Sequence, residues 1–478
     1  MTERLLVASN RGPVSWQRSD DGNLTPRRGF GGLVTALGGA LQNEEGTWVS
    51  VALSAEDREV AAAHPGEPFA VQTDGATFEL RLLDVGDRYE PYYNQIANRL
   101  LWFTVHGLWG EPYEPLGIGW RDAWEAYVSV GEEVAAAVIA SADGQDAEVY
   151  LQDYHLCSAP DAVRAGLPRA RILHYLHTPW VGPSELRRLP DPIAEGVLRG
   201  LLGADVVAVS SPKWAAAFRR GAVEVLGAVP DGDGLWYDGR RTIVADFVLG
   251  VDEDDLAASA ARAETIEAGE RLDAEAAGRA LILRVDRSDL SKNILRGLQA
   301  YETLLDRHPE HRGRVWHYAH LNLSRQGVPE YRTYLEACQA AADRIAERFG
   351  PDALTLALTD HYPTAVAALQ RSDVLLTNPV RDGTNLVAKE GPVLNDRNGV
   401  LVLSRDAGAA DVLGEGALLV NAYDVEAQAE ALHTALVMPA EERAARADLL
   451  RVAARRGAPG EWFAGQRATL RAATTPRV

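Results

Sequence analysis

Short apolar runs alternate with longer helix-like segments along almost the whole chain, and this alternation constrains the fold more than any other feature. Residues 5–8 (LLVA), 149–151 (VYL), 172–176 (ILHYL) and 206–209 (VVAV) are such runs in the first half. Runs of this kind, each ended by a turn or by the start of a helix, are typical of parallel strands buried on both faces. The pattern predicts an α/β fold built from doubly wound, Rossmann-like sheets.

The second half of the chain repeats the pattern. Residues 281–283, 374–376 and 400–403 are apolar enough for central strands, and apolar residues recur at helical spacing over 294–305. At about 150 residues per domain, 478 residues correspond to two to four domains. We expect a first domain over residues 1–248 and a second over 249–458.

The boundary between these domains is expected within residues 246–255, with a hinge near Gly250, because a turn precedes this stretch and an acidic run ends it. The C-terminal segment, residues 459–478, carries Trp462 and Phe463 in a polar setting. We expect it to form a helix that packs back on the first domain.

Charge and cysteine content exclude several classes of function. The chain has 48 basic and 68 acidic residues, so its net charge of −20 argues against nucleic acid or an anionic membrane as a partner. Two distant cysteines, Cys157 and Cys338, form no disulfide framework. No segment has the length of a membrane span and the N-terminus does not fit a signal peptide, so we expect a cytoplasmic protein. Formation of a homo-oligomer stays open.

Common catalytic and metal-binding motifs are missing from the sequence. It has no Walker A loop, no Gly-x-Ser-x-Gly elbow and no His-Glu-x-x-His pair. Asp231-Gly232-Asp233 matches a metal-binding Asp-x-Asp pattern, but its flanking proline and glycine favour a turn. We therefore expect neither a metal nor a cofactor.

Ligands of doubly wound sheets bind beyond the carboxyl ends of the strands, so the residues that follow each strand are the candidates for a site. In the first half, Arg11 follows the 5–8 run and fits a phosphate, and Gly32 belongs to a glycine-rich helix start. Asp153 and His177 follow two later strands and fit sugar hydroxyls. Each of these residues, taken alone, also fits an ordinary structural role.

The second half supplies more charged candidates. Arg287 and Lys292 follow the 281–283 run, and two cations in one strand-to-helix loop suit a diphosphate and the charge on a departing nucleotide. After the 374–376 run, Asp382 and Asn385 precede a predicted helix that carries Glu390. These carboxylates fit the hydroxyl groups of a sugar and of a ribose.

Together these segments resemble the trehalose-6-phosphate synthases over nearly the whole chain. The matching motifs occur in the order of that family: Ser9-Asn10-Arg11; Gly31-Gly32-Leu33; Tyr92-Tyr93-Asn94-Gln95 with Trp102; Asp153-Tyr154-His155-Leu156; Leu176-His177-Thr178-Pro179; Val285-Asp286-Arg287 through Lys292; Ser324-Arg325; and Arg381-Asp382-Gly383-x-Asn385-Leu386-Val387-Ala388-Lys389-Glu390. Each motif is weak alone, whereas eight in order are highly specific.

The resemblance implies a GT-B fold, two Rossmann-like domains facing across a cleft. It implies a retaining, metal-independent transfer of glucose from a nucleoside diphosphate glucose to glucose 6-phosphate. The roles it implies are listed by ligand: Arg287, Lys292 and Gly32 at the donor diphosphate, Glu390 at the ribose, His177, Asp382, Asn385 and Leu386 at the transferred glucose, Arg11, Tyr93 and Arg325 at the acceptor phosphate, and Trp102 and Asp153 at the acceptor sugar. Arg287, Lys292, His177 and Asp382 would be the catalytic residues.

Three positions depart from the usual family pattern. Asn293 replaces a common glycine, Trp180 replaces a common phenylalanine, and Pro392 should perturb the helix that carries Glu390. At these three positions the sequence resembles the validoxylamine phosphate synthases, which couple a GDP-linked cyclitol to an aminocyclitol phosphate. This similarity favours GDP over UDP as the nucleotide and leaves cyclitol coupling as an alternative function. A non-catalytic sugar-phosphate sensor is a second alternative, although it would be expected to lack the charged leaving-group residues.

Overall fold

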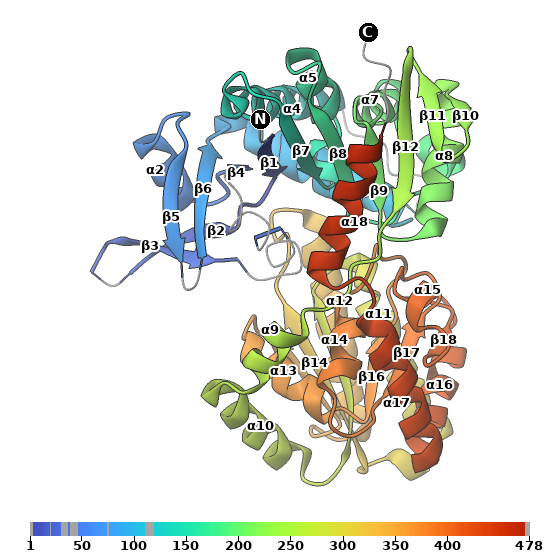
Figure 1. Cartoon of the computed structure of the whole chain (residues 1–478). Coiled ribbons are helices and arrows are strands. Elements are labelled where there is room, and N and C mark those ends of the chain that lie inside the picture. The colour runs from blue at the N-terminus through green and yellow to red at the C-terminus, as the bar shows by residue number, and fades with distance from the viewer. Residues whose placement is uncertain are drawn as a thin grey trace. The chain divides into compact units, whose positions relative to one another are not determined.

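The structure is a computed structural model that describes residues 3–19, 21–29, 37–38, 46–73, 76–109 and 119–473 (Figure 1). The chain divides into two compact units, which are described separately. Unit 1 comprises Met1–Leu249 and Pro459–Val478, and unit 2 comprises Gly250–Ala458. The chain passes from unit 1 to unit 2 at Gly250 and returns to unit 1 at Pro459.

Unit 1 is built on a sheet whose described part has ten strands in the order β10-β11-β12-β9-β8-β7-β1-β4-β6-β5. The strands from β12 to β6 pair in parallel, and the strands beyond them on each edge pair antiparallel. A separate hairpin pairs β2 with β3. The bounds are β1 (Arg4–Ser9), β2 (Val14–Arg18), β3 (Leu24–Arg28), β4 (Gly46–Val51), β5 (Phe69–Thr73), β6 (Ala76–Leu83), β7 (Ala147–Gln152), β8 (Arg171–Leu176), β9 (Val206–Val209), β10 (Val229–Asp231), β11 (Gly234–Tyr237) and β12 (Arg240–Asp246).

The helices of unit 1 within the described residues lie between its strands, except for the C-terminal α18. They are α2 (Ala55–Ala63), η1 (Gly86–Arg88), η2 (Pro91–Leu101), α3 (Trp102–Val105), α4 (Trp120–Ala142), η3 (Tyr154–Leu156), α5 (Ala159–Gly166), α6 (Pro183–Leu186), α7 (Asp191–Leu201), α8 (Pro212–Leu226) and α18 (Pro459–Ala472). Helix α8 begins with a serine cap, since the Ser211 hydroxyl accepts a bond from the Lys213 N–H at 3.3 Å. Helix α18 packs against β8 and β9 and buries Trp462 and Phe463 (Figure 1).

Unit 2 contains a six-stranded, wholly parallel sheet in the order β15-β14-β13-β16-β17-β18 within the described residues. Its strands are β13 (Ala280–Arg287), β14 (Val315–Asn322), β15 (Leu354–Leu358), β16 (Val374–Thr377), β17 (Val400–Ser404) and β18 (Leu418–Val420). Its helices are α9 (Glu253–Ala260), α10 (Ala263–Ala276), η4 (Leu290–Lys292), α11 (Ile294–Arg307), η5 (Pro309–His311), α12 (Pro329–Phe349), α13 (Tyr362–Arg371), α14 (Val387–Leu394), α15 (Ala410–Leu413), α16 (Val425–Val437) and α17 (Ala440–Ala454).

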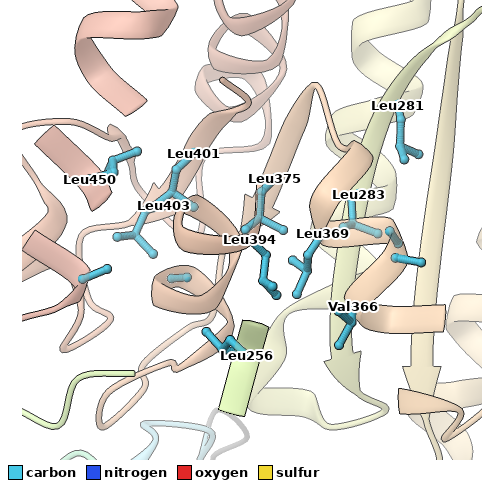
Figure 2. Close-up of a cluster of buried hydrophobic side chains, with 14 of the residues drawn as sticks. Leu256, Leu281, Leu283, Val366, Leu369, Leu375, Leu394, Leu401, Leu403 and Leu450 are labelled. Atoms are coloured by element: carbon cyan, nitrogen blue, oxygen red, sulfur yellow. The ribbon is translucent and has the colours of Figure 1, made fainter. Parts of the chain in front are cut away.

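Alternating side chains of each central strand of unit 2 enter two different cores. Leu281 and Leu283 of β13 join one buried cluster with residues of α9, α13, α14 and α17 (Figure 2). Ile282, between them, belongs to a second cluster with α11, α12 and α16. Burial on both faces explains the continuous apolar runs at 281–283, 374–376 and 400–403, which predicted a parallel sheet. Since fully burying one such side chain contributes roughly 1.5–3 kcal/mol, the two cores hold the strand ends in fixed positions.

The interpretation of Asp231-Gly232-Asp233 as a turn is confirmed. Gly232 has a φ of +58°, and Asp231 pairs with Gly234 across the β10–β11 hairpin. Both carboxylates bind Arg241, at 2.7 and 2.5 Å. The two aspartates therefore stabilise the β10–β11 hairpin, which lies at the edge of the sheet, through their ion pairs with Arg241.

Candidate functional site

The loop between β13 and α11 places Arg287, Lys292 and Asn293 at the carboxyl end of the unit 2 sheet. Arg287 ends β13, and its side chain is 45% exposed. Lys292 ends the short helix η4, and the next residue, Asn293, has a φ of +58°. Glycine adopts this left-handed conformation without strain and asparagine tolerates it, so the departure from the usual glycine is compatible with the same loop.

Lys292 and Asp382 are brought together from two different strands. The Lys292 ammonium lies 2.5 Å from Asp382 Oδ2, and each side chain is 14% exposed. Asn385, with a φ of +71°, donates from Nδ2 to the same carboxylate at 3.1 Å and accepts the Ala388 N–H at 3.0 Å. Asn385 thus caps α14 and orients Asp382 at once.

Glu390 lies in the first turn of α14, where its N–H bonds the Leu386 carbonyl at 2.8 Å. Burial, and to a smaller extent the charge of Asp255, raise the pKa of Glu390 to about 7. The neighbouring Lys389 is buried, and burial lowers its pKa to about 8. Helix α14 continues through Pro392 to Leu394, and the Asn395 N–H still bonds the Gly391 carbonyl at 2.9 Å, so the proline leaves the following turn intact.

A buried polar network supports the loop from beneath. Arg284 is fully buried on β13, contacts Asp286 at 2.7 Å, donates to the Lys292 carbonyl at 3.0 Å and also binds the Asn378 side chain. Asn293 Nδ2 donates to the Asn378 carbonyl at 3.0 Å. Burial raises the pKa of Asp286 to about 6 in spite of Arg284. These bonds fix the backbone that carries Lys292.

In unit 1, Arg11 lies directly beyond the carboxyl end of β1. The Ser9 hydroxyl donates to the Arg11 carbonyl at 2.6 Å and accepts the Trp48 indole N–H at 2.7 Å. The Tyr92 hydroxyl donates to Asn10 Oδ1 at 2.9 Å. The backbone is therefore held on both sides while the Arg11 side chain is exposed.

Asp153 and His177 follow the neighbouring strands β7 and β8 and contact each other. Asp153 has a φ of +69°, and its Oδ1 accepts the His177 N–H at 3.2 Å. His177 Nε2 lies 3.0 Å from Gln152 Oε1, and its ring packs 6.1 Å from Trp462. Burial lowers the pKa of His177 to about 4, so the imidazole is neutral at pH 7 and fits a sugar hydroxyl better than a phosphate.

Two aromatic residues that the sequence assigned to the acceptor differ in environment. Tyr93 stacks between Tyr89, at 5.0 Å, and His155, at 5.6 Å, and remains partly exposed. Trp102 is 6% exposed and stacks on His106 at 3.8 Å. Trp102 therefore offers little surface to a ligand in this structure.

Of the remaining predicted site residues, Arg325 belongs to unit 2 and follows β14, where its guanidinium binds the buried Asp289 at 2.8 Å. Gly32 lies outside the described residues. Sequence reasoning did not single out Gln152 or Asp289. Asp289 lies inside the Arg287 to Lys292 motif, and the usual preference for aspartate at helix starts could have drawn attention to it.

Among the described residues, His308, Glu310 and His433 form a group whose ligand atoms lie within 4.8 Å of one another. The rings of His308 and His433 are stacked at 3.7 Å with an interplanar angle of 9°. A metal ion binds imidazole in the ring plane, so one ion does not fit both stacked rings. No helix in the described part of the chain is both long and apolar enough to cross a membrane.

The sequence pattern of glycosyltransferase family 20 matches residues 3–470. The chain belongs to this family. A bifunctional trehalose-6-phosphate synthase/phosphatase of Thermoproteus tenax is 33% identical over 93% of the chain and 60% of its own length. The chain spans 54% to 60% of the length of this and two other curated relatives.

Solved structures share the fold along their full length. An E. coli protein bound with UDP-2-fluoro glucose superposes with a TM-score of 0.85 and 26% identity, covering 99% of this chain and 100% of the other. A UDP-forming α,α-trehalose-phosphate synthase from Burkholderia xenovorans, in complex with glucose 6-phosphate, gives 0.83 and 27%, covering 98% and 100%. The predicted α/β class with parallel sheets, that of GT-B enzymes, is confirmed. The preference for GDP is not supported, since these synthases are named UDP-forming.

Proposed function

We propose that this chain transfers glucose from a nucleoside diphosphate glucose to glucose 6-phosphate and forms α,α-trehalose 6-phosphate with retention. The proposal rests mainly on the contact between Lys292 and Asp382, 2.5 Å apart at the strand ends of unit 2, with Arg287 in the same loop. In such a pair the cation can bind the diphosphate of the donor, and the adjacent carboxylate can accept hydrogen bonds from the hydroxyls of the attached sugar. The ligands of the E. coli and Burkholderia structures, UDP-2-fluoro glucose and glucose 6-phosphate, belong to the same two chemical classes as the proposed donor and acceptor.

In the proposed reaction, Arg287 and Lys292 bind the donor diphosphate and Glu390 accepts the ribose hydroxyls. The anomeric hydroxyl of the acceptor attacks C1 of the donor glucose on the face of the leaving group, and the C1–O bond to the diphosphate breaks. A phosphate oxygen of the leaving nucleoside diphosphate takes the hydroxyl proton, while the two cations stabilise its charge. Asp382 and the neutral His177 orient the transferred glucose. Arg11, Tyr93 and Arg325 bind the acceptor phosphate, with Asp153 at its sugar.

The names of the relatives and three positions in the sequence favour different nucleosides for the donor. The names of the relatives favour UDP-glucose. The departures at Asn293, Trp180 and Pro392 favour GDP-glucose by branch resemblance. Both donors therefore enter the test.

The test measures product formation from glucose 6-phosphate with UDP-glucose and GDP-glucose supplied separately. Trehalose 6-phosphate from either donor, with both anomeric centres α by NMR, supports the proposal, and the ratio of rates identifies the nucleoside. Lys292→Met should lower kcat at least about a hundredfold, whereas Asp373→Asn, a change at the amino end of β16, should leave kcat unchanged. No product from either donor, with both ligands bound, contradicts the proposal and favours cyclitol coupling or a sensor. A glycosyl-enzyme detected by intact mass spectrometry contradicts front-face attack.

A further inference from the structure

Asp289 is a fully buried carboxylate in the loop between β13 and η4. Its Oδ1 accepts two bonds from one neighbour, from the Ser291 N–H and from the Ser291 hydroxyl, both at 2.9 Å. These bonds cap η4 and fix the orientation of the carboxylate. A carboxylate removed from water in this way requires a cation at its other oxygen.

The other oxygen of Asp289 faces two arginines. Oδ2 accepts from Arg325 Nη1 at 2.8 Å and from the Tyr331 hydroxyl at 3.3 Å, and Arg287 Nη2 lies 3.9 Å away. Arg325 Nη1 also donates to the Tyr331 hydroxyl at 2.6 Å. The Arg325 side chain is 7% exposed, whereas that of Arg287 is 45% exposed.

The topology explains why one carboxylate reaches both arginines. Strands β13 and β14 are parallel neighbours, and Arg287 pairs in register with Asn322 at their carboxyl ends. Arg325 lies three residues after Asn322, in the loop that follows β14. Arg287 and Arg325 therefore lie at the same end of two neighbouring strands. Arg325 has a φ of +44°, a conformation that costs a non-glycine residue about 1–2 kcal/mol and that the bonds to Asp289 and Tyr331 offset.

We propose that Asp289 is a positioning residue that orients Arg287 and Arg325 together, so that the donor-diphosphate and acceptor-phosphate positions depend on one buried carboxylate. This inference rests on the proposed function, which assigns the two arginines to the two substrates. Asp289 itself touches neither substrate in this scheme. It acts on Arg325 through a hydrogen bond of 2.8 Å and on Arg287 through the attraction of charges 3.9 Å apart, and both contacts favour a guanidinium direction suited to phosphate binding.

Asp289→Asn is the main test because the side chains have nearly the same shape. Its amide offers one oxygen and one NH₂ group, so a donor or a neutral oxygen replaces the charge that faces the arginines. We expect KM for glucose 6-phosphate to rise about tenfold or more, the lower limit for losing the hydrogen bond between Arg325 and a charged group. KM for the donor should rise less, about two- to fivefold, because Arg287 lies 3.9 Å from the carboxylate and is 45% exposed. Arg325→Ala alone should raise KM for glucose 6-phosphate and leave KM for the donor within about twofold.

A double-mutant cycle separates positioning from general damage. In the Arg325→Ala background, Asp289→Asn should leave KM for glucose 6-phosphate unchanged and still raise KM for the donor. Tyr331→Phe, a milder variant that removes one hydroxyl beside Arg325, should raise KM for glucose 6-phosphate alone and serves if Asp289→Asn does not fold. The matched control is Asp373→Asn, at the amino end of β16, whose carboxylate lies 3.5 Å from Arg443 and 3.9 Å from Arg397. It should change neither KM.

Several results would overturn the proposal. They are a folded Asp289→Asn variant with a lower kcat and unchanged KM values, additive effects of the two substitutions on KM for glucose 6-phosphate, and an unchanged KM for glucose 6-phosphate in Tyr331→Phe. Failure of the proposed function is a different observation, because the wild-type chain would then form no trehalose 6-phosphate.

Discussion

Replacing Glu390 by glutamine should stabilise the protein at alkaline pH and weaken donor binding at the same time. Burial raises the pKa of Glu390 from 4.5 to about 7, so the folded chain holds this proton where the unfolded chain has lost it. Stability from this group is therefore fully present below pH 4.5 and is lost as the pH rises to about 7. The difference of about 2.5 pH units corresponds to about 3 kcal/mol, which Glu390→Gln should recover at pH 8.

The same protonation should control donor affinity in the wild-type chain. If ribose hydroxyls donate to the ionised carboxylate, only that form binds well. About one tenth of the chains carry ionised Glu390 at pH 6 and about nine tenths at pH 8, so KM for the donor should be roughly tenfold higher at pH 6. In Glu390→Gln, KM for the donor should be raised at pH 8 and nearly independent of pH.

Two measurements check this reasoning: urea unfolding of both proteins from pH 5 to 8, and donor KM over the same range. The difference between the two unfolding curves isolates Glu390 from other titrating groups such as Asp286. Asp255→Asn removes the second cause of the raised pKa and should move the pH midpoint of donor KM downward. Equal pH dependence of unfolding in wild type and Glu390→Gln would refute the assignment of a raised pKa.

Three further predictions concern the loop above the buried network. Lys292→Met should lower kcat at least about a hundredfold while the protein stays folded, as initial rates and circular dichroism would show, because a charge on the leaving group loses its partner. Asn293→Ala should destabilise the chain more than Asn293→Gly, by about 1 kcal/mol in thermal unfolding, because only glycine adopts a φ of +58° without strain. Arg284→Met should cost about 3–5 kcal/mol in urea unfolding, since Asp286 would stay buried without its cation; a loss below 1 kcal/mol would contradict this.

The central strands of both sheets could be predicted because burial on both faces leaves a continuous apolar run. The 281–283 and 400–403 runs lie inside β13 and β17, whose alternate side chains enter the two cores of unit 2. The edge strands gave no such signal. Strand β10 is exposed at all three positions, and the β2–β3 hairpin lies outside the main sheet, so neither has an apolar run to detect.

The positions after the strands predicted that Lys292 and Asp382 lie at the same end of the unit 2 sheet, but not that they contact each other or how they are held. Lys292 and Asp382 are 90 positions apart, and parallel pairing of β13 with β16 brings their loops together. The ion pair between Asp289 and Arg325 was not predicted because it depends on the register between two strands. Asp289 and Arg325 follow different strands, and a sequence pattern does not show that a charge in one loop is paired with a charge in the next.

The acidity of the chain is compatible with the two proposed phosphorylated substrates because charge acts over short distances. The chain has a net charge of −20, but at physiological salt an exposed charge is screened beyond about 8 Å. At the strand ends of unit 2, by contrast, Lys292 and Arg325 are 14% and 7% exposed and each is held by a carboxylate. Such cations are ordered before a phosphate arrives, so less conformational entropy is lost on binding than with free surface lysines. The local order of these cations, more than the overall charge, therefore determines which anions this edge of the sheet accepts.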